Sequence, residues 1–155
     1  MKLRLLGAVT AIALIGGAAS ALAGYGQTQP NDPNKLKANL TGAAERPGPG
    51  DPNGSGRALV TLRQRARRVC FNITFRRIGR PVAAHIHKGG RRVAGDIVVL
   101  FFERPNGVSS PVRGCANGVA RSLIRDIRER PGRFYVNLHT RSYPNGAIRG
   151  QLKRR

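Results

Sequence analysis

The sequence predicts an all-β protein: an antiparallel, Greek-key-like sandwich or barrel of about seven or eight strands, with one short helix near residues 119–130. Short segments alternate between apolar and polar residues, as strands with one buried face do. Turn-forming residues separate these segments about every 8 to 12 positions. The chain has 155 residues and no internal repeat, so we expect one folded domain.

Residues 1–23 have the features of a secretory signal peptide. Lys2 and Arg4 form a basic start, a short apolar run covers 5–17, and Ala21–Ala23 is an A-x-A cleavage site. The run is shorter than the roughly 20 apolar residues that a membrane-spanning helix needs. We therefore expect a secreted protein, extracellular or associated with the cell envelope, with no transmembrane segment after cleavage.

Composition divides the remaining chain into a leader, a domain and a tail. Residues 24–35 are rich in Gly, Gln, Pro and Asn, which predicts a flexible leader. The β domain is expected to cover 36–152, followed by a mobile basic tail, 153–155. Within the domain, strands are predicted near these segments: 36–44, 56–63, 69–75, 82–87, 96–102, 134–139 and 147–152.

The strand predictions differ in the faces that they bury. Segment 69–75 alternates most clearly, with Val69, Phe71 and Ile73 on one face. In contrast, 96–102 is an almost unbroken apolar run, which predicts a strand buried on both faces. Between 119 and 130 the apolar residues instead recur at helical spacing, and Pro131-Gly132 ends the predicted helix.

Two cysteines, Cys70 and Cys115, lie in the predicted mature chain. In an oxidising compartment such a pair predicts one disulfide. A free buried thiol and a metal ligand are the alternatives, which the absence of further cysteines makes weaker.

The chain is strongly basic, with 28 Lys and Arg residues against 7 Asp and Glu residues. Removal of Lys2 and Arg4 leaves a net charge near +19. Such a charge attracts anionic polymers, including those of a cell envelope. The basic residues are spread along the chain and are not interleaved with aromatic residues, so we expect no specific nucleic-acid binding.

Several motifs together resemble the CHRD domain, a family named after chordin and frequent in exported bacterial proteins. They match in family order and spacing over about residues 36–152: Leu40-Thr41-Gly42-Ala43-Ala44-Glu45-Arg46-Pro47, Cys70-Phe71-Asn72-Ile73, Ala84-His85-Ile86-His87-Lys88-Gly89, Gly114-Cys115, Phe134-Tyr135-Val136-Asn137-Leu138-His139-Thr140 and Pro144-Asn145-Gly146-Ala147-Ile148-Arg149-Gly150-Gln151-Leu152. The resemblance implies an extracellular all-β domain and does not imply a reaction.

All three histidines of the chain lie within these motifs. His85 and His87 are two residues apart, so on a strand they project from the same face, and His139 projects from its own strand opposite Val136 and Leu138. If the two strands are neighbours, three imidazoles converge, which suits copper or zinc. Ala84-His85-Ile86-His87 also resembles the copper-binding segment of Cu,Zn superoxide dismutases, but the rest of that signature is missing.

The alternative interpretation of the histidines is structural. With four further residues they would form a polar network that fixes the register of the sheet; those residues are Asn137, Thr140, Arg149 and Gln151. The same residues therefore allow two hypotheses, a metal site or a hydrogen-bonded network.

The sequence favours a non-enzymatic, secreted binding or envelope-associated module, with a basic surface suited to anionic polymers. There is no G-x-S-x-G elbow, and the few acidic residues form no paired-carboxylate motif. The alternative is a copper- or zinc-binding protein that uses His85, His87 and His139, with redox chemistry as a further option.

Overall fold

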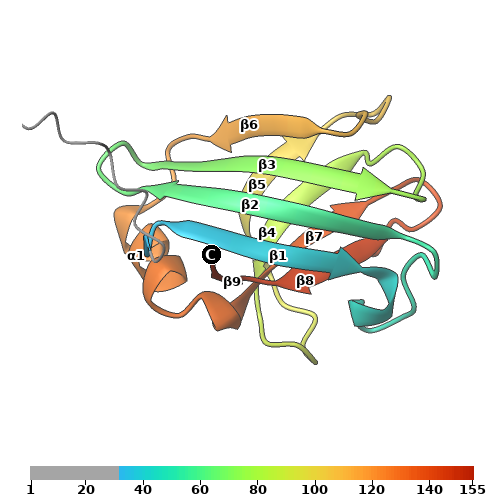
Figure 1. The fold of residues 1–155 in the computed structure, drawn as a ribbon, viewed down its shortest axis with the longest axis horizontal. Coiled ribbons are helices and arrows are strands. Elements are labelled where there is room, and N and C mark those ends of the chain that lie inside the picture. The colour runs from blue at the N-terminus through green and yellow to red at the C-terminus, as the bar shows by residue number, and fades with distance from the viewer. Residues whose placement is uncertain (1–31) are drawn as a thin grey trace, which may run out of the picture.

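The computed structural model describes residues 32–155 (Figure 1). The predicted signal peptide and most of the predicted leader lie outside the described residues. None of the helices between 32 and 155 has the length and apolar character needed to cross a membrane.

The described chain contains nine strands, one α-helix and two short 3-10 helices. In chain order they are β1 (Lys35–Thr41), η1 (Gly42–Ala44), β2 (Ser55–Arg63), β3 (Arg68–Arg76), β4 (Ala83–Lys88), β5 (Ile97–Glu103), β6 (Val112–Ala116), α1 (Arg121–Glu129), η2 (Pro131–Arg133), β7 (Phe134–His139), β8 (Ile148–Gln151) and β9 (Lys153–Arg154). The prediction of an all-β protein with one short helix is confirmed.

The strands form one antiparallel sheet in the order β5-β4-β7-β8-β1-β2-β3-β6, with β9 paired to β1. In Figure 1, β6, β3, β2 and β1 lie in front, and β5, β4 and β7 cross behind them. The two edge strands, β5 and β6, contact each other, so the sheet is a nearly closed barrel.

The core lies inside the barrel and is built from the apolar faces that the alternation predicts. In the register of β2 with β3, Ala58 lies opposite Ile73 and Val60 opposite Phe71, and all four side chains are buried. The remaining strands add buried side chains of the same kind: Leu36, Leu40, Ile86, Val99, Phe134, Val136, Leu138, Ile148 and Leu152.

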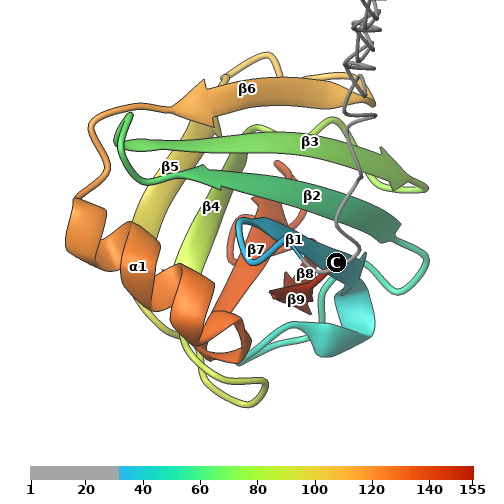
Figure 2. The same cartoon turned by 60° about the vertical axis from the view of Figure 1, so that its left-hand side comes forward.

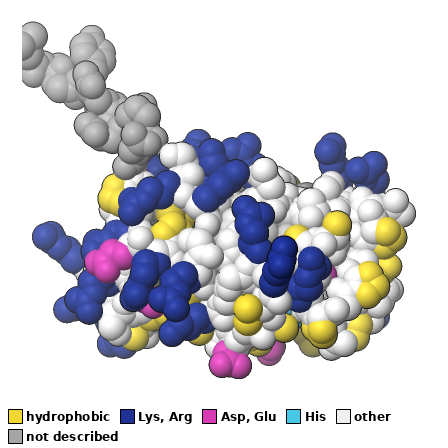
Figure 3. Space-filling model, turned by 90° about the horizontal axis from the view of Figure 1, so that it is seen from below, with side chains coloured by type: hydrophobic (Ala, Val, Ile, Leu, Met, Phe, Trp, Pro, Cys, Tyr) yellow, Lys and Arg dark blue, Asp and Glu magenta, His cyan; other side chains and the backbone are white. Residues whose placement is uncertain are grey.

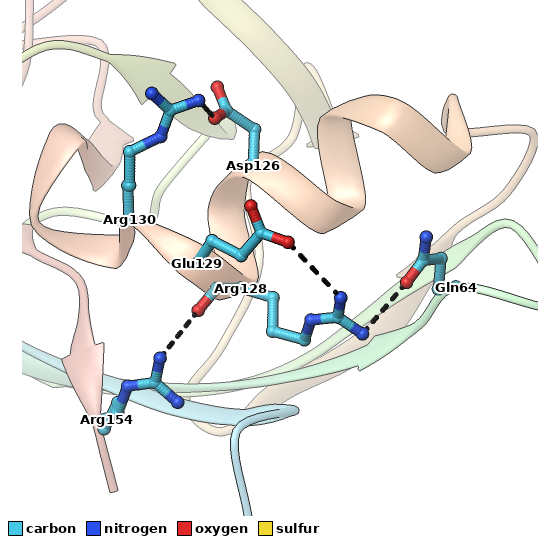
Figure 4. Close-up of polar contacts among 6 residues, drawn as sticks. All are labelled: Gln64, Asp126, Arg128, Glu129, Arg130 and Arg154. Carbon is cyan, nitrogen blue, oxygen red and sulfur yellow. Dashed lines mark hydrogen bonds and ion pairs between the residues drawn. The ribbon is translucent and has the colours of Figure 1, made fainter.

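Helix α1 packs at one end of the barrel (Figure 2). It buries Ile124 and Ile127, two of the residues that its sequence pattern places on the apolar side. Its polar contacts reach two other parts of the fold (Figure 4). The Arg128 Nη1 donates to Oε1 of Gln64, 3.1 Å away, and Arg154 of β9 donates to the carbonyl of Arg128.

Cys70 and Cys115 form a disulfide, as predicted. They lie directly opposite each other in the pairing of β3 with β6. The bond therefore links the edge strand β6 to the body of the sheet. Strand β6 itself was not predicted, because its short sequence contains Arg113 and Gly114 and does not alternate.

Three predictions need correction. The apolar run at 96–102 is not buried on both faces: Ile97 is 54% and Leu100 48% exposed, because β5 lies at the edge of the sheet. The tail 153–155 was predicted to be mobile, yet Lys153 and Arg154 form β9. The first strand was predicted over 36–44, but β1 ends at Thr41 and a 3-10 turn follows.

Candidate metal centre

The pairing of β4 with β7 brings the three histidines together. In this antiparallel register Ala83 lies opposite His139, His85 opposite Asn137, and His87 opposite Tyr135. Because side chains alternate along a strand, all the polar members of these pairs project from the face of the sheet that points away from the core. The two strands are thus neighbours, which is the condition that convergence of the histidines required.

The imidazole rings form a compact triangle. Ring centroids are 5.0 Å apart for His85 and His139, 5.5 Å for His85 and His87, and 6.1 Å for His87 and His139. One ring nitrogen from each residue can be chosen so that all three lie within 4.8 Å of one another. This spacing is small enough for one ion to contact all three after small side-chain rotations.

Hydrogen bonds to backbone carbonyls orient two of the rings. His87 Nδ1 is 2.8 Å from the Gly95 carbonyl oxygen, and His139 Nδ1 is 2.9 Å from the Pro144 carbonyl oxygen. A carbonyl only accepts, so each Nδ1 carries the proton and each Nε2 keeps its lone pair. Metal-binding histidines are oriented in the same way in proteins.

Four ring nitrogens of this cluster are buried and have no hydrogen-bond partner among the described residues: His85 Nδ1, His85 Nε2, His87 Nε2 and His139 Nε2. A buried polar atom without a partner costs about 1–3 kcal/mol, so such atoms are rare in folded proteins. These four atoms lie in one cluster of three neighbouring rings.

Burial keeps the histidines neutral. It lowers the pKa of His85 to about 4, with smaller contributions from His139 and His87. Burial also lowers the pKa of His87 and His139, against the hydrogen bonds to Gly95 and Pro144. At neutral pH all three rings therefore offer lone pairs, and a metal ion would not have to displace protons.

Tyr135 separates the histidine cluster from Arg149. Its ring stacks on His87, with centroids 4.8 Å apart and an interplanar angle of 6°. The Arg149 guanidinium carbon lies 3.5 Å from the centroid of the same ring. Since β7 lies between β4 and β8, the aromatic ring is placed between the imidazole and the guanidinium.

Arg149 and Gln151 hold the loop between β4 and β5, residues 89–96. Arg149 donates to the carbonyls of Val93 and Gly90, each at 3.1 Å, and Gln151 Nε2 donates to Gly89 at 2.7 Å. This loop also supplies the Gly95 carbonyl that His87 contacts. Arg149 projects away from the core, as its position in β8 predicts, but the loop covers it and leaves it only 1% exposed.

The predicted polar network takes a different form from the one expected. Asn137 donates to Glu45 at 3.3 Å, and the Thr140 hydroxyl accepts from the Tyr143 amide at 3.2 Å. Neither these side chains nor Arg149 and Gln151 hydrogen-bond to a histidine. They hold the surrounding loops instead, while the histidine Nε2 atoms stay without partners.

Glu45 and Tyr135 are residues of this region that the sequence did not single out. Glu45 is 3% exposed, and burial raises its pKa to about 7, although Arg149 and the Asn137 hydrogen bond act in the opposite direction. Tyr135 shares strand parity with Asn137 and His139, a signal that was available. No sequence pattern indicated that the loop carrying Glu45 would pack against β7.

In the metal-free protein, His85 and Glu45 are expected to make stability depend on pH in opposite directions. The ordinary pKa of His85 is 6.5 and its pKa in the folded protein is about 4. The contribution of neutral His85 to folding stability is therefore lost as the pH falls from 6.5 towards 4. Folding raises the pKa of Glu45 from 4.5 to about 7. The contribution of protonated Glu45 to folding stability is therefore lost as the pH rises through this range. Glu45→Gln is therefore expected to gain stability more steeply than the wild type from about pH 5 to pH 7.

Urea unfolding in the presence of a chelator measures both profiles. Glu103→Gln, which changes an exposed carboxylate, is the matched control and should follow the wild type. Parallel profiles for Glu45→Gln and the wild type would contradict the assignment of a buried, protonated Glu45.

A comparison with protein-family models matches the CHRD domain over residues 36–152. The chain belongs to the CHRD family. The match covers β1 to β8 and includes all three histidines and both cysteines of the CHRD domain. No curated protein and no solved structure matched the chain significantly. Membership suggests a non-enzymatic domain of extracellular type, and the disulfide is compatible with that location.

Proposed function

We propose that this CHRD domain binds one copper or zinc ion through His85, His87 and His139. The observation that carries the proposal is the set of four buried ring nitrogens without partners, drawn from three imidazoles within reach of one another. Three neutral nitrogen ligands leave one coordination position open for water or an anion, as in catalytic zinc sites and several copper sites.

The surroundings favour a resident ion over a simple hydrogen-bonded network. In a network, each Nε2 would have a donor to accept from, whereas these atoms have none, and one ring nitrogen from each histidine lies within 4.8 Å of the other two. Arg149 opposes the binding of a cation through its charge, but the Tyr135 ring lies between it and His87. The backbone hydrogen bonds at Nδ1 of His87 and His139 make both rings better ligands.

Metal titration of the chelator-treated protein, followed by elemental analysis, tests the proposal. The wild type is expected to bind one zinc or copper ion per chain, and His139→Ala to lose affinity by about 100-fold or more because one of three ligands is missing. Thr140→Ala is the matched control: it truncates a buried neighbour whose hydroxyl makes no hydrogen bond to a histidine. Metal at background level in the wild type, or unchanged binding in His139→Ala, would refute the site.

A second candidate function follows from the charge. Among the charged side chains on the face in Figure 3, Lys and Arg predominate, and Asp and Glu occupy few places. A secreted, envelope-associated module would use such a surface to stay near anionic polymers. This attraction is expected to weaken as salt concentration rises, because exposed charges are screened; affinity independent of salt would contradict it.

A further inference from the structure

A cavity of about 330 Å³ is lined by four arginines from three separate parts of the chain. Arg46 comes from the loop after η1, Arg91 and Arg92 from the β4–β5 loop, and Arg149 from β8. Asn39 and Thr41 of β1 add an amide and a hydroxyl to the wall. Among the described residues that line the cavity, none is acidic and none is a histidine.

Arg149 is a buried cation without a paired anion. It is the largest fully buried side chain of the described chain, and its hydrogen bonds go to two neutral backbone carbonyls. No carboxylate within residues 32–155 lies within 4.0 Å of it. Buried charges are costly unless they are paired. A guanidinium has five N–H groups, and the two carbonyls take up only two of those of Arg149.

Glu45, a carboxyl group whose charge acts on Arg149, does not fill this role. Its own burial raises its pKa to about 7, so much of it is protonated at neutral pH. Its Oε2 accepts a hydrogen bond from the Asn137 side-chain amide and not from Arg149. The positive charge of the cavity is thus left for a ligand to balance.

We infer that this cavity binds phosphate, either as the free ion or as the terminal phosphate of a monoester. Arginine forks match the oxygens of a tetrahedral oxyanion in pairs, and four of them suit a doubly charged group better than a single carboxylate. Asn39 and Thr41 supply further polar partners. The site gives the anion attraction of the second candidate function a defined location, and it does not depend on the metal proposal.

The cavity is separate from the histidine cluster, but both are bordered by the β4–β5 loop. Arg149 lines the cavity, and Tyr135 stands between Arg149 and His87. The β4–β5 loop carries Arg91 and Arg92 and is held by the Arg149 hydrogen bonds to Gly90 and Val93. A bound phosphate would therefore tie this loop to β8 more firmly.

Calorimetric titration of the full, chelator-treated chain with inorganic phosphate, at about 0.15 M NaCl, tests the inference. Arg91→Gln combined with Arg92→Gln is expected to weaken phosphate binding by about tenfold or more. Arg63→Gln combined with Arg65→Gln removes the same charge from the exposed β2–β3 hairpin and is expected to change the affinity by less than about twofold. Both double variants alter exposed side chains, so the fold should be retained.

Glycerol 3-phosphate distinguishes the two sources of the ligand. Binding at least as tight as that of inorganic phosphate assigns the cavity to a phosphate monoester, and weaker binding assigns it to free phosphate. No phosphate binding by the wild type, or equal losses in the two double variants, would overturn the site. Metal titration of the Arg91/Arg92 variant keeps the two proposals apart, since its metal affinity should equal that of the wild type.

Discussion

Replacing both Cys70 and Cys115 with alanine is expected to lower the free energy of unfolding by about 4 kcal/mol, the loop-entropy value for a 45-residue separation. The effect is large because the bond links the edge strand β6 to β3, and the segment that it closes contains β4 with two of the three histidines. Urea unfolding of the oxidised wild type and of the double variant measures the difference.

A reducing agent supplies the control for this prediction. It should destabilise the wild type to the level of the double variant and leave the double variant unchanged. Equal stability of the oxidised wild type and the double variant would show that the disulfide contributes nothing to the fold. That result would also remove an argument for folding in an oxidising compartment.

The second large effect is expected at Gly95, whose carbonyl orients His87. A Cβ atom at this position would lie 1.7 Å from the Lys88 carbonyl oxygen, so Gly95→Ala requires the backbone to move. The movement would displace the acceptor of the His87 Nδ1 proton and also the amide that donates to the Tyr135 hydroxyl. We expect Gly95→Ala to lower zinc affinity by about 10- to 100-fold, which is the usual effect of losing a hydrogen bond that orients a metal-binding histidine.

Gly90→Ala is the matched control within the same loop. A Cβ atom at Gly90 meets nothing within 4 Å, so metal affinity and stability should stay close to the wild-type values. Competitive titration against a chromophoric chelator compares the two variants. Equal affinities would show that the loop does not position His87.

Much of the fold was predictable from sequence, because a barrel with one buried face gives each strand a period of two. β2, β3 and β7 were located in this way, and α1 followed from apolar residues at helical spacing. The elements that were missed or misjudged lie at the edges of the sheet. Strand β6 is too short to alternate clearly, and β5 is apolar on a face that the structure exposes.

The candidate site was predictable to the extent that it depends on strand parity. His85, His87 and His139 were expected to share a face if their strands paired, and the β4–β7 register fulfils that condition. The loop contacts were not predictable, because they join residues far apart in the chain. Glu45 meets Asn137 across 92 positions, and Arg149 meets Gly90 across 59.

Membership of the CHRD family establishes the fold but does not determine the chemistry, which depends on the individual residues. In this chain the polar face of β4, β7 and β8 is covered by loops, which buries groups that an open sheet would leave to water. Two features have no partner among the described residues: imidazole nitrogens that lack donors, and an arginine that lacks an anion. They are the basis of the two sites proposed above.

X-ray absorption spectroscopy of the zinc-loaded protein tests the central claim most directly. Binding through His85, His87 and His139 predicts three imidazole nitrogens at about 2.0 to 2.1 Å and one further light atom. The outer-shell scattering that is characteristic of imidazole should fall by one third in His139→Ala. A zinc shell dominated by oxygen, or one with fewer than two imidazoles in the wild type, would contradict the account.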